Sequence, residues 1–271
     1  MALLELFIVA LFGCIVGSFL NVYILRLNTG RSTTGRSGCM SCRKQLTWQE
    51  LIPVISFFML RGRCRGCGSR ISHQYWIVEI LTALLFVCVW LQGLPLIPAV
   101  LMLVLVSELV VIAVYDIKHT IIPNTVVYPF LLTALLLSAS LLGTYTPKSI
   151  ALYVAVSVIN GVIVALPLLL LWVFSRGRWM GLGDVKLVLG FGMLLGVYYG
   201  LMAMMLGFVI GAVVGLFLLY APRVIKHMSL SPTSTRFTMK SEIPFAPFLI
   251  VGFFLVLFFN ADLITLVGYL I

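Results

Sequence analysis

The sequence predicts an all-α polytopic membrane protein with about eight transmembrane helices and a small cytoplasmic zinc-ribbon insert. Of the 271 residues, 62% are hydrophobic and only 10% are charged, and the mean hydropathy is +1.17. In a water-soluble domain, roughly a quarter of the residues are charged. The apolar residues also gather in runs that are long enough to cross a bilayer as helices. Lipid is therefore the expected environment of most of this chain.

The spanning segments follow one another along the whole chain. The first lacks a basic leading region and a small-residue cleavage site, so we expect residues 1–27 to remain as the first helix and not as a removable signal peptide. The boundary near Tyr198 to Gly200 is the least marked, and one kinked helix there would reduce the count to seven. The expected segments cover residues 2–25, 74–92, 97–115, 124–143, 150–174, 185–199, 201–221 and 245–269.

The basic residues predict the orientation of these helices. With eight spans, seventeen of the 18 Lys and Arg residues lie on one side, and only Lys148 lies on the other. The positive-inside rule makes the populated side cytoplasmic. The formal net charge of +10 thus follows the topology. Because it forms no basic stripe interleaved with aromatic residues, we expect no nucleic-acid partner.

One polar insert, residues 28–72, separates the first helix from a membrane core at residues 73–271. It contains the pairs C39-M-S-C42 and C64-R-G-C67. Two such pairs are typical of a zinc ribbon, in which Cys39, Cys42, Cys64 and Cys67 form a tetrahedral shell. Four thiolates leave no position for water, so the zinc is expected to be structural. Disulfides and redox chemistry are the alternatives, and a reducing cytoplasm disfavours structural disulfides.

Two acidic residues are the strongest candidates for chemistry. Asp116 ends the third span, and Asp184 begins the sixth within G181-L-G-D-V-K186. We expect Gly181 and Gly183 to supply backbone freedom for a tight, non-helical approach. Two carboxylates at the same depth share one proton, so that one activates water while the other polarises a scissile carbonyl. This geometry predicts an aspartyl peptidase.

From the residues alone, a structural interpretation of the acids stays open. A cap on a helix end, or an ion pair with Lys118 or Lys186 two residues later, explains each aspartate equally well. Ionisable residues within membrane spans are functional candidates by default, and this applies also to Glu79 and Glu108. We expect a structural role for Glu108, whereas Glu79 either pairs with an arginine or lines the substrate path.

Taken together and in this order, the motifs resemble those of the type IV prepilin peptidase family, the G-x-G-D membrane aspartyl peptidases. The resemblance extends over nearly the whole chain. Besides the cysteine pairs and the two aspartate motifs, it rests on G17-S-F-L-N-V22, W48-Q-E-L-I-P-V-I-S56, I71-S-H-Q-Y-W-I-V-E79 and I243-P-F-A-P-F248. Two departures, the missing proline after Cys39 and the sequence H73-Q-Y-W76, touch neither aspartate.

The resemblance implies a function that the residues alone do not give. Asp116 and Asp184 become the catalytic pair, and the substrates are prepilins or pseudopilins, cleaved on the cytoplasmic side after a glycine. Many members also N-methylate the new N-terminus with S-adenosylmethionine, an activity associated with the cysteine-bearing insert. The chain has no G-x-G-x-x-G helix start, so no residue is assigned to the methyl donor.

Two other functional classes compete with a peptidase. A transporter with the aspartates as a proton relay usually shows internal repeats and broken helices near the midplane, whereas these acids lie near one face. A non-enzymatic scaffold with a zinc-ribbon docking module explains the cysteines but leaves both acids unexplained. The sequence therefore favours the enzyme.

Overall fold

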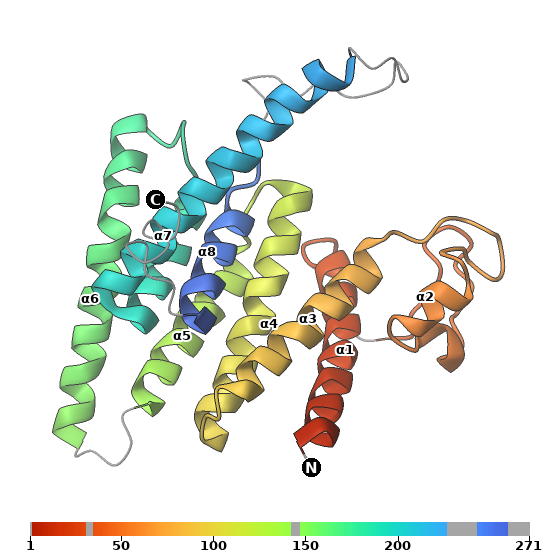
Figure 1. Ribbon diagram of the computed structural model, residues 1–271, viewed down its shortest axis with the longest axis horizontal. Coiled ribbons are helices and arrows are strands. Elements are labelled where there is room, and N and C mark those ends of the chain that lie inside the picture. Colours follow the sequence, from red (N-terminus) through yellow and green to blue (C-terminus); the bar gives the residue numbers. More distant parts are fainter. Residues whose placement is uncertain (1, 31–34, 142–146, 227–242, 260–271) are drawn as a thin grey trace. The chain divides into compact units, whose positions relative to one another are not determined.

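The computed structural model describes residues 2–30, 35–141, 147–226 and 243–259, and these residues form almost only helices (Figure 1). The β-structure among them is limited to two isolated bridges. This confirms the all-α prediction. The elements are α1 (Ala2–Arg26), the 3₁₀ helix η1 (Trp48–Leu51), α2 (Ile55–Met59), α3 (Gln74–Leu91), α4 (Leu96–His119), α5 (Asn124–Ser140), α6 (Pro147–Ser175), α7 (Leu182–Lys226) and α8 (Ala246–Phe259).

Five of the described helices are long and apolar enough to cross a membrane. They contain the spans Leu3–Arg26, Gln74–Leu91, Leu96–His119, Ala151–Ser175 and Leu182–Tyr220. The shorter helices α5 and α8 are also apolar. Residues 142–143 and 260–269 of the expected segments lie outside the described residues. The expectation of a multi-pass helical protein is thus confirmed at the level of several spans.

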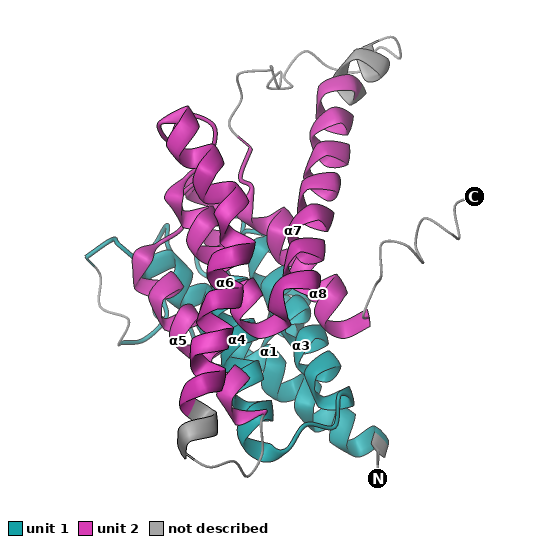
Figure 2. Cartoon of the chain, turned by 90° about the vertical axis from the view of Figure 1, so that its left-hand side faces the viewer, with its two compact units in different colours: residues 1–111 teal, residues 112–271 magenta. Residues whose placement is uncertain are grey.

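The chain divides into two compact units, residues 1–111 and 112–271 (Figure 2). In the first unit, α1 and α3 approach until their backbones touch. A Cβ atom built on Gly13 would lie 2.6 Å from Cα of Ala83, and one on Gly17 would lie 2.8 Å from Cα of Glu79. Small residues four apart allow this approach, which is typical of helix pairs in membranes. The two helices are therefore fixed in register along their length.

A buried polar side chain completes this helix pair. Asn21 is fully buried, and its Nδ2 donates a hydrogen bond to the carbonyl of Tyr75 at 3.0 Å. The side chain of Gln74 in turn donates to Oδ1 of Asn21 at 3.2 Å. Since a buried amide without partners would be costly, these bonds specify how the end of α1 meets the start of α3.

The second unit has a core of aromatic rings and close glycine contacts. The rings of Phe191 and Phe253 stack with centroids 4.4 Å apart, and Phe130 meets Phe191 edge-on. A Cβ on Gly192 would lie 2.8 Å from Cα of Gly161, so that α6 and α7 also touch through their backbones. This tight packing gives α7 a defined position against α5, α6 and α8.

Helix α7 contains a sharp break at Gly196, where φ is 77° and ψ is −177°. A Cβ on Gly200 would lie 3.1 Å from Cα of Gly192, although a continuous helix separates residues eight apart by about 12 Å. The chain therefore folds back on itself here. The break lies at Gly196 and not at the boundary expected near Tyr198 to Gly200, because the left-handed backbone needs a glycine at the turn itself.

Candidate active site and metal centre

Asp116 lies one turn before the end of α4 and is only 4% exposed. Its Oδ2 accepts a hydrogen bond of 3.1 Å from the backbone N–H of Ala246, the first residue of α8. The first amides of a helix have no partner within the helix and favour negative charge nearby. The start of α8 therefore orients the Asp116 carboxylate.

Asp184 is the third residue of α7 and is 9% exposed. Its carboxylate is hydrogen-bonded by the backbone of Gly181, the residue before the helix, an arrangement that resembles half of a capping box. The expected non-helical approach holds for Gly181, which precedes α7, but it is wrong for Gly183, which lies inside the helix and has no positive φ. The glycine is needed there for space, because a Cβ on Gly183 would lie 2.7 Å from Cβ of Ile122.

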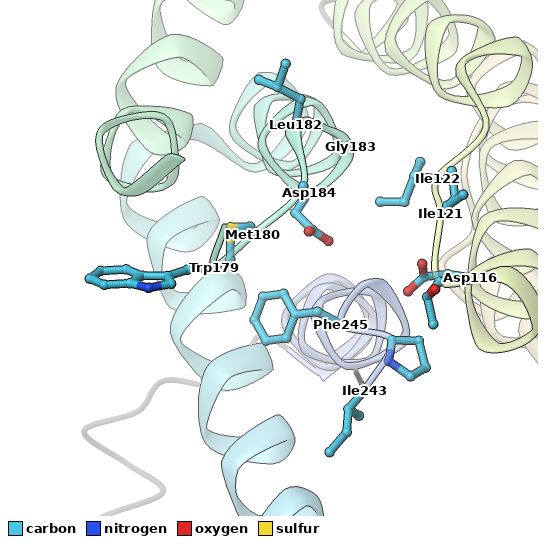
Figure 3. A pocket seen from close by; sticks show the side chains of 13 residues that line it. Asp116, Ile121, Ile122, Trp179, Met180, Leu182, Gly183, Asp184, Ile243 and Phe245 are labelled. Atoms are coloured by element: carbon cyan, nitrogen blue, oxygen red, sulfur yellow. The ribbon is translucent and has the colours of Figure 1, made fainter. Parts of the chain in front are cut away.

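Both carboxylates line one cavity of about 330 Å³. Figure 3 shows them at opposite walls, with Asp116 coming from the end of α4 and Asp184 from the start of α7. They are close enough for an electrostatic interaction between them. The rest of the lining is mostly apolar and consists of Thr120, Ile121, Ile122, Trp179, Met180, Gly181, Leu182, Gly183, Ile243, Pro244 and Phe245. Two acids facing a small apolar space are suited to proton transfer around a bound peptide bond.

The lysine that follows Asp184 is engaged elsewhere. The ammonium group of Lys186 donates to Oδ1 of Asn124 at 2.8 Å and to the hydroxyl of Tyr128 at 3.1 Å, and it lies over the Tyr128 ring. Lys118 is exposed at the end of α4. The polar contacts that the structure gives to the two carboxylates come from backbone amides. The geometry thus argues against lysine pairing as the reason for these acids.

The four predicted metal ligands come together in the insert. The Sγ atoms of Cys39, Cys42, Cys64 and Cys67 all lie within 4.8 Å of one another, and none of the four cysteines forms a disulfide. Sγ of Cys39 is 3.9 Å from Sγ of Cys67. A tetrahedral site with zinc–sulfur bonds of about 2.3 Å requires a separation of about 3.8 Å. The donor set therefore fits a zinc ion.

The two cysteine turns repeat one backbone pattern. Cys39 donates its N–H to the carbonyl of Lys44, and Cys64 donates to that of Ser69, each at 2.9 Å. The fourth residue after each of these cysteines has a left-handed backbone, Arg43 with φ 59° and Gly68 with φ 70°. Each half is thus a tight turn that directs two thiols to the same side.

Two of the four thiols favour metal binding by their surroundings. Hydrogen bonds from the backbone of Cys42 and then of Ser41 lower the pKa of the Cys39 thiol to about 6. Hydrogen bonds to Ser69 lower the pKa of the Cys67 thiol. Because the thiolate is the form that binds metals, both shifts favour a bound cation. The Cys42 thiol differs: although a backbone hydrogen bond from Lys44 lowers its pKa, desolvation and the neighbouring thiols raise it to about 11.

Sequence reasoning missed two structural roles. The amide of Ala246 and the ring of Phe245 belong to the acid site, and the proline-flanked I243-P-F-A-P-F248 at a helix start was a signal for a fixed backbone at this point. Glu79 was left open between two roles, and the structure places it in the first unit, where its Oε2 accepts the N–H of Val54 at 2.7 Å. Glu108 lies within α4, eight residues before Asp116.

Comparisons with known proteins agree with these motifs. A family model described as "Bacterial Peptidase A24 N-terminal domain" matches residues 11–93, and one described as "Type IV leader peptidase family" matches residues 103–216. Three similar proteins are each named "Prepilin leader peptidase/N-methyltransferase". The Bacillus subtilis protein is 32% identical over 95% of this chain and 96% of its own length. The Vibrio cholerae protein is 28% identical over 90% of this chain and 92% of its own length. The Myxococcus xanthus protein is 46% identical over 49% of this chain and 41% of its own. No solved structure matches the chain significantly.

Proposed function

Because the chain belongs to the type IV leader peptidase family, we propose that it is an aspartyl endopeptidase that removes the leader peptide of type IV prepilins or pseudopilins. The observation that carries this proposal is the shared cavity. Asp116 and Asp184 are 68 positions apart in the sequence, yet both are buried and both line the same small space. The names of the relatives supply the substrate class.

The catalytic roles follow from the chemistry of a carboxylate pair. One aspartate, ionised, takes a proton from the attacking water, while the protonated partner donates a hydrogen bond to the scissile carbonyl. The tetrahedral intermediate then collapses as the acid gives its proton to the leaving amine. The amides of Ala246 and Gly181 hold the two carboxylates in place, and apolar side chains such as Phe245 line the space between them.

We further propose the eight-helix topology, with the aspartates and the cysteine cluster facing the cytoplasm of a bacterial inner membrane. The break at Gly196 supports two crossings by α7, and the distribution of the cations supports the orientation. In this arrangement residues 1–27 form the first helix, 28–72 the zinc-ribbon insert and 73–271 the peptidase core. The first half of α7, before Gly196, is short, and a helix of this length spans only a thin or locally deformed bilayer.

The second proposed activity is N-methylation of the new pilin N-terminus with S-adenosylmethionine, in line with the names of the relatives. When bound, S-adenosylmethionine would supply an electrophilic methyl group to the amine exposed by cleavage, with release of S-adenosylhomocysteine and a proton. Zinc at Cys39, Cys42, Cys64 and Cys67 is proposed to be structural. With four sulfur donors the ion has no open position for a substrate, and its role is to order an insert that is too small for a large core.

The decisive experiment compares processing by the wild type, Asp116→Asn and Asp184→Asn. Each is co-expressed with a candidate prepilin, and the pilin N-terminus is measured by intact mass spectrometry. We expect a shortened product, heavier by one methyl group, with the wild type, and unprocessed pilin with either variant. Glu5→Gln is the matched control, because it makes the same change at an exposed acid in the first turn of α1.

The outcomes separate the parts of the proposal. Cleavage by Asp184→Asn at the wild-type rate would remove this residue from the mechanism. Cleavage without methylation by the wild type, under saturating methyl donor, would contradict only the second activity. Each variant is first shown to insert in the membrane at the wild-type level, so that loss of processing reports chemistry.

A further inference from the structure

The insert exposes much apolar surface for a small extramembrane segment. Ile55, Phe58 and Met59 are spaced so that they share one face of α2, and they are 56%, 59% and 73% exposed. We call these three residues the apolar face of α2. In the neighbouring η1, Trp48 and Leu51 are 72% and 42% exposed. Apolar patches of this kind rimmed by polar residues mark an interaction site or a contact with lipid.

Along the axis of α3, helix α2 lies beside the first turns of α3 and not past its N-terminal end. The N–H of Val54, directly before α2, donates to Oε2 of Glu79 at 2.7 Å. Glu79 is the sixth residue of α3, about 7.5 Å along its axis from the first. The Phe58 ring also lies 5.9 Å from the ring of Trp76 in the first turn, and Figure 1 draws α2 beside the first part of α3. The apolar face of α2 therefore lies near the depth at which α3 enters lipid.

The insert also carries a strong excess of positive charge. Residues 28–72 contain eight Arg and Lys residues and a single acid, Glu50. Glu50 is 9% exposed, and its carboxylate accepts the backbone N–H of Thr47 at 2.8 Å. A zinc ion with four thiolates contributes a net charge of −2. Eight cations against this charge and one carboxylate leave +5, so the metal centre neutralises only part of the excess.

Two of these cations oppose each other directly after α2. Arg63 and Arg70 are partners in an antiparallel β-bridge, and both are exposed. Arg61 and Arg65 are exposed beside them. Like charges that are opposite each other across paired strands destabilise the pairing. An anion between or beneath these guanidinium groups would remove the repulsion, which points to an anionic partner next to the apolar face.

We infer that the insert lies on the anionic surface of the membrane. The apolar face of α2 enters the boundary between headgroups and acyl chains, and Arg61, Arg63 and Arg70 contact lipid phosphates. Interfacial elements combine these two features, apolar side chains on one face and basic residues near anionic lipid. The apolar face of α2 contacts a spanning helix of the same unit, since the Phe58 ring packs against Trp76 at the start of α3. This inference does not depend on the proposed peptidase activity.

The test places a photo-crosslinking residue in the full-length protein. Met59→p-benzoylphenylalanine probes the apolar face, and Gln49→p-benzoylphenylalanine is the control at an exposed polar position of η1. Both proteins are reconstituted in nanodiscs of phosphatidylcholine, with or without about one third of phosphatidylglycerol, and their zinc content is compared with the wild type. After illumination, mass spectrometry identifies what each probe has captured. We expect phospholipid adducts at position 59, about five-fold more than at position 49.

The charge contribution has its own prediction. Each basic residue near an anionic surface contributes about five-fold to binding, so the adducts at position 59 should increase several-fold when phosphatidylglycerol is present. The variant with Arg63→Gln and Arg70→Gln should lose most of this increase and come close to the yield seen in pure phosphatidylcholine. Equal lipid capture at both positions, or capture at position 59 of a second copy or of a co-reconstituted pilin in place of lipid, would overturn the inference.

Discussion

Replacing Gly183 with alanine should disable the acid site through a steric clash with the side chain of Ile122. The new methyl group would lie 2.7 Å from Cβ of Ile122, and 3.1 and 3.2 Å from two further atoms of the same side chain. Ordinary contacts of a Cβ begin near 3.4 Å. Because Cβ of Ile122 is fixed to its backbone, no change of rotamer relieves the clash. Either the start of α7 or the loop after α4 must therefore move by about 0.7 Å, and overpacking of this kind costs about 1–3 kcal/mol.

This movement would reach the proposed catalytic pair at once. Asp184 follows Gly183 directly, and Ile122 lies six residues after Asp116. A misplacement near 1 Å between reacting groups can lower a rate by about 100-fold, and we expect a loss of that order for Gly183→Ala. Gly181→Ala is the matched control. Its methyl group would meet only Oδ2 of Asp184 at 3.7 Å and the Gly183 nitrogen at 3.8 Å, so its rate should stay within about three-fold of the wild type.

The assay is the initial rate of pilin cleavage by purified protein in nanodiscs, with thermal unfolding measured in parallel. A Gly183→Ala protein with wild-type activity would refute the reasoning, and so would a Gly181→Ala protein that is the more impaired of the two. The addition of Ile122→Gly to Gly183→Ala removes the opposing Cβ atom. Partial recovery of the rate in the double variant would identify the clash itself as the cause.

Three further predictions test other parts of the molecule. Arg43→Gly should stabilise the first cysteine turn by about 1 kcal/mol, because arginine is strained at φ 59°. The measurement is the rate of zinc loss to a chelator, which should be slower than in the wild type. Gly68→Ala should have the opposite effect on this rate. Glu79→Ala removes the acceptor of the Val54 N–H at a cost of about 1.5–3 kcal/mol, so proteolysis within the insert should accelerate while the spans stay protected. Ser157→Ala removes a hydroxyl that bonds the carbonyl of Met193 and should lower the thermal stability by about 1–3 kcal/mol, with wild-type stability as the contrary result.

The sequence predicts well those features that are determined by residues close together in the chain. Apolar runs predict the membrane helices, because a helix that crosses a bilayer must be both long enough and hydrophobic enough. Two C-x-x-C pairs give the cysteine cluster, because each pair forms its own turn. The G-x-G-D motif and the acid at the end of α4 single out Asp184 and Asp116, and both line one cavity. In each case a few neighbouring residues determine the outcome.

The features that sequence does not give depend on tertiary neighbours. Gly183 was assigned backbone freedom, but its dihedral angles are ordinary, and the need for glycine comes from Ile122 on another segment. The amide of Ala246 serves Asp116 only because α8 starts beside the end of α4. The break at Gly196 leaves no gap in hydrophobicity, since apolar residues continue on both sides of it, and composition cannot distinguish a turn within lipid from a continuous helix.

The break at Gly196 is also what allows the acid site to form. The start of α7 carries Asp184 at one end of the unit, and a straight helix would deliver the chain, and with it the start of α8, far from that end. Because α7 folds back, its second half runs antiparallel to α8, with Gly207 against Leu249 and Gly252 against the carbonyl of Ala203. The amide of Ala246 thereby returns to the level of Asp116. A glycine that contacts neither acid thus determines whether the amide donor of α8 reaches Asp116.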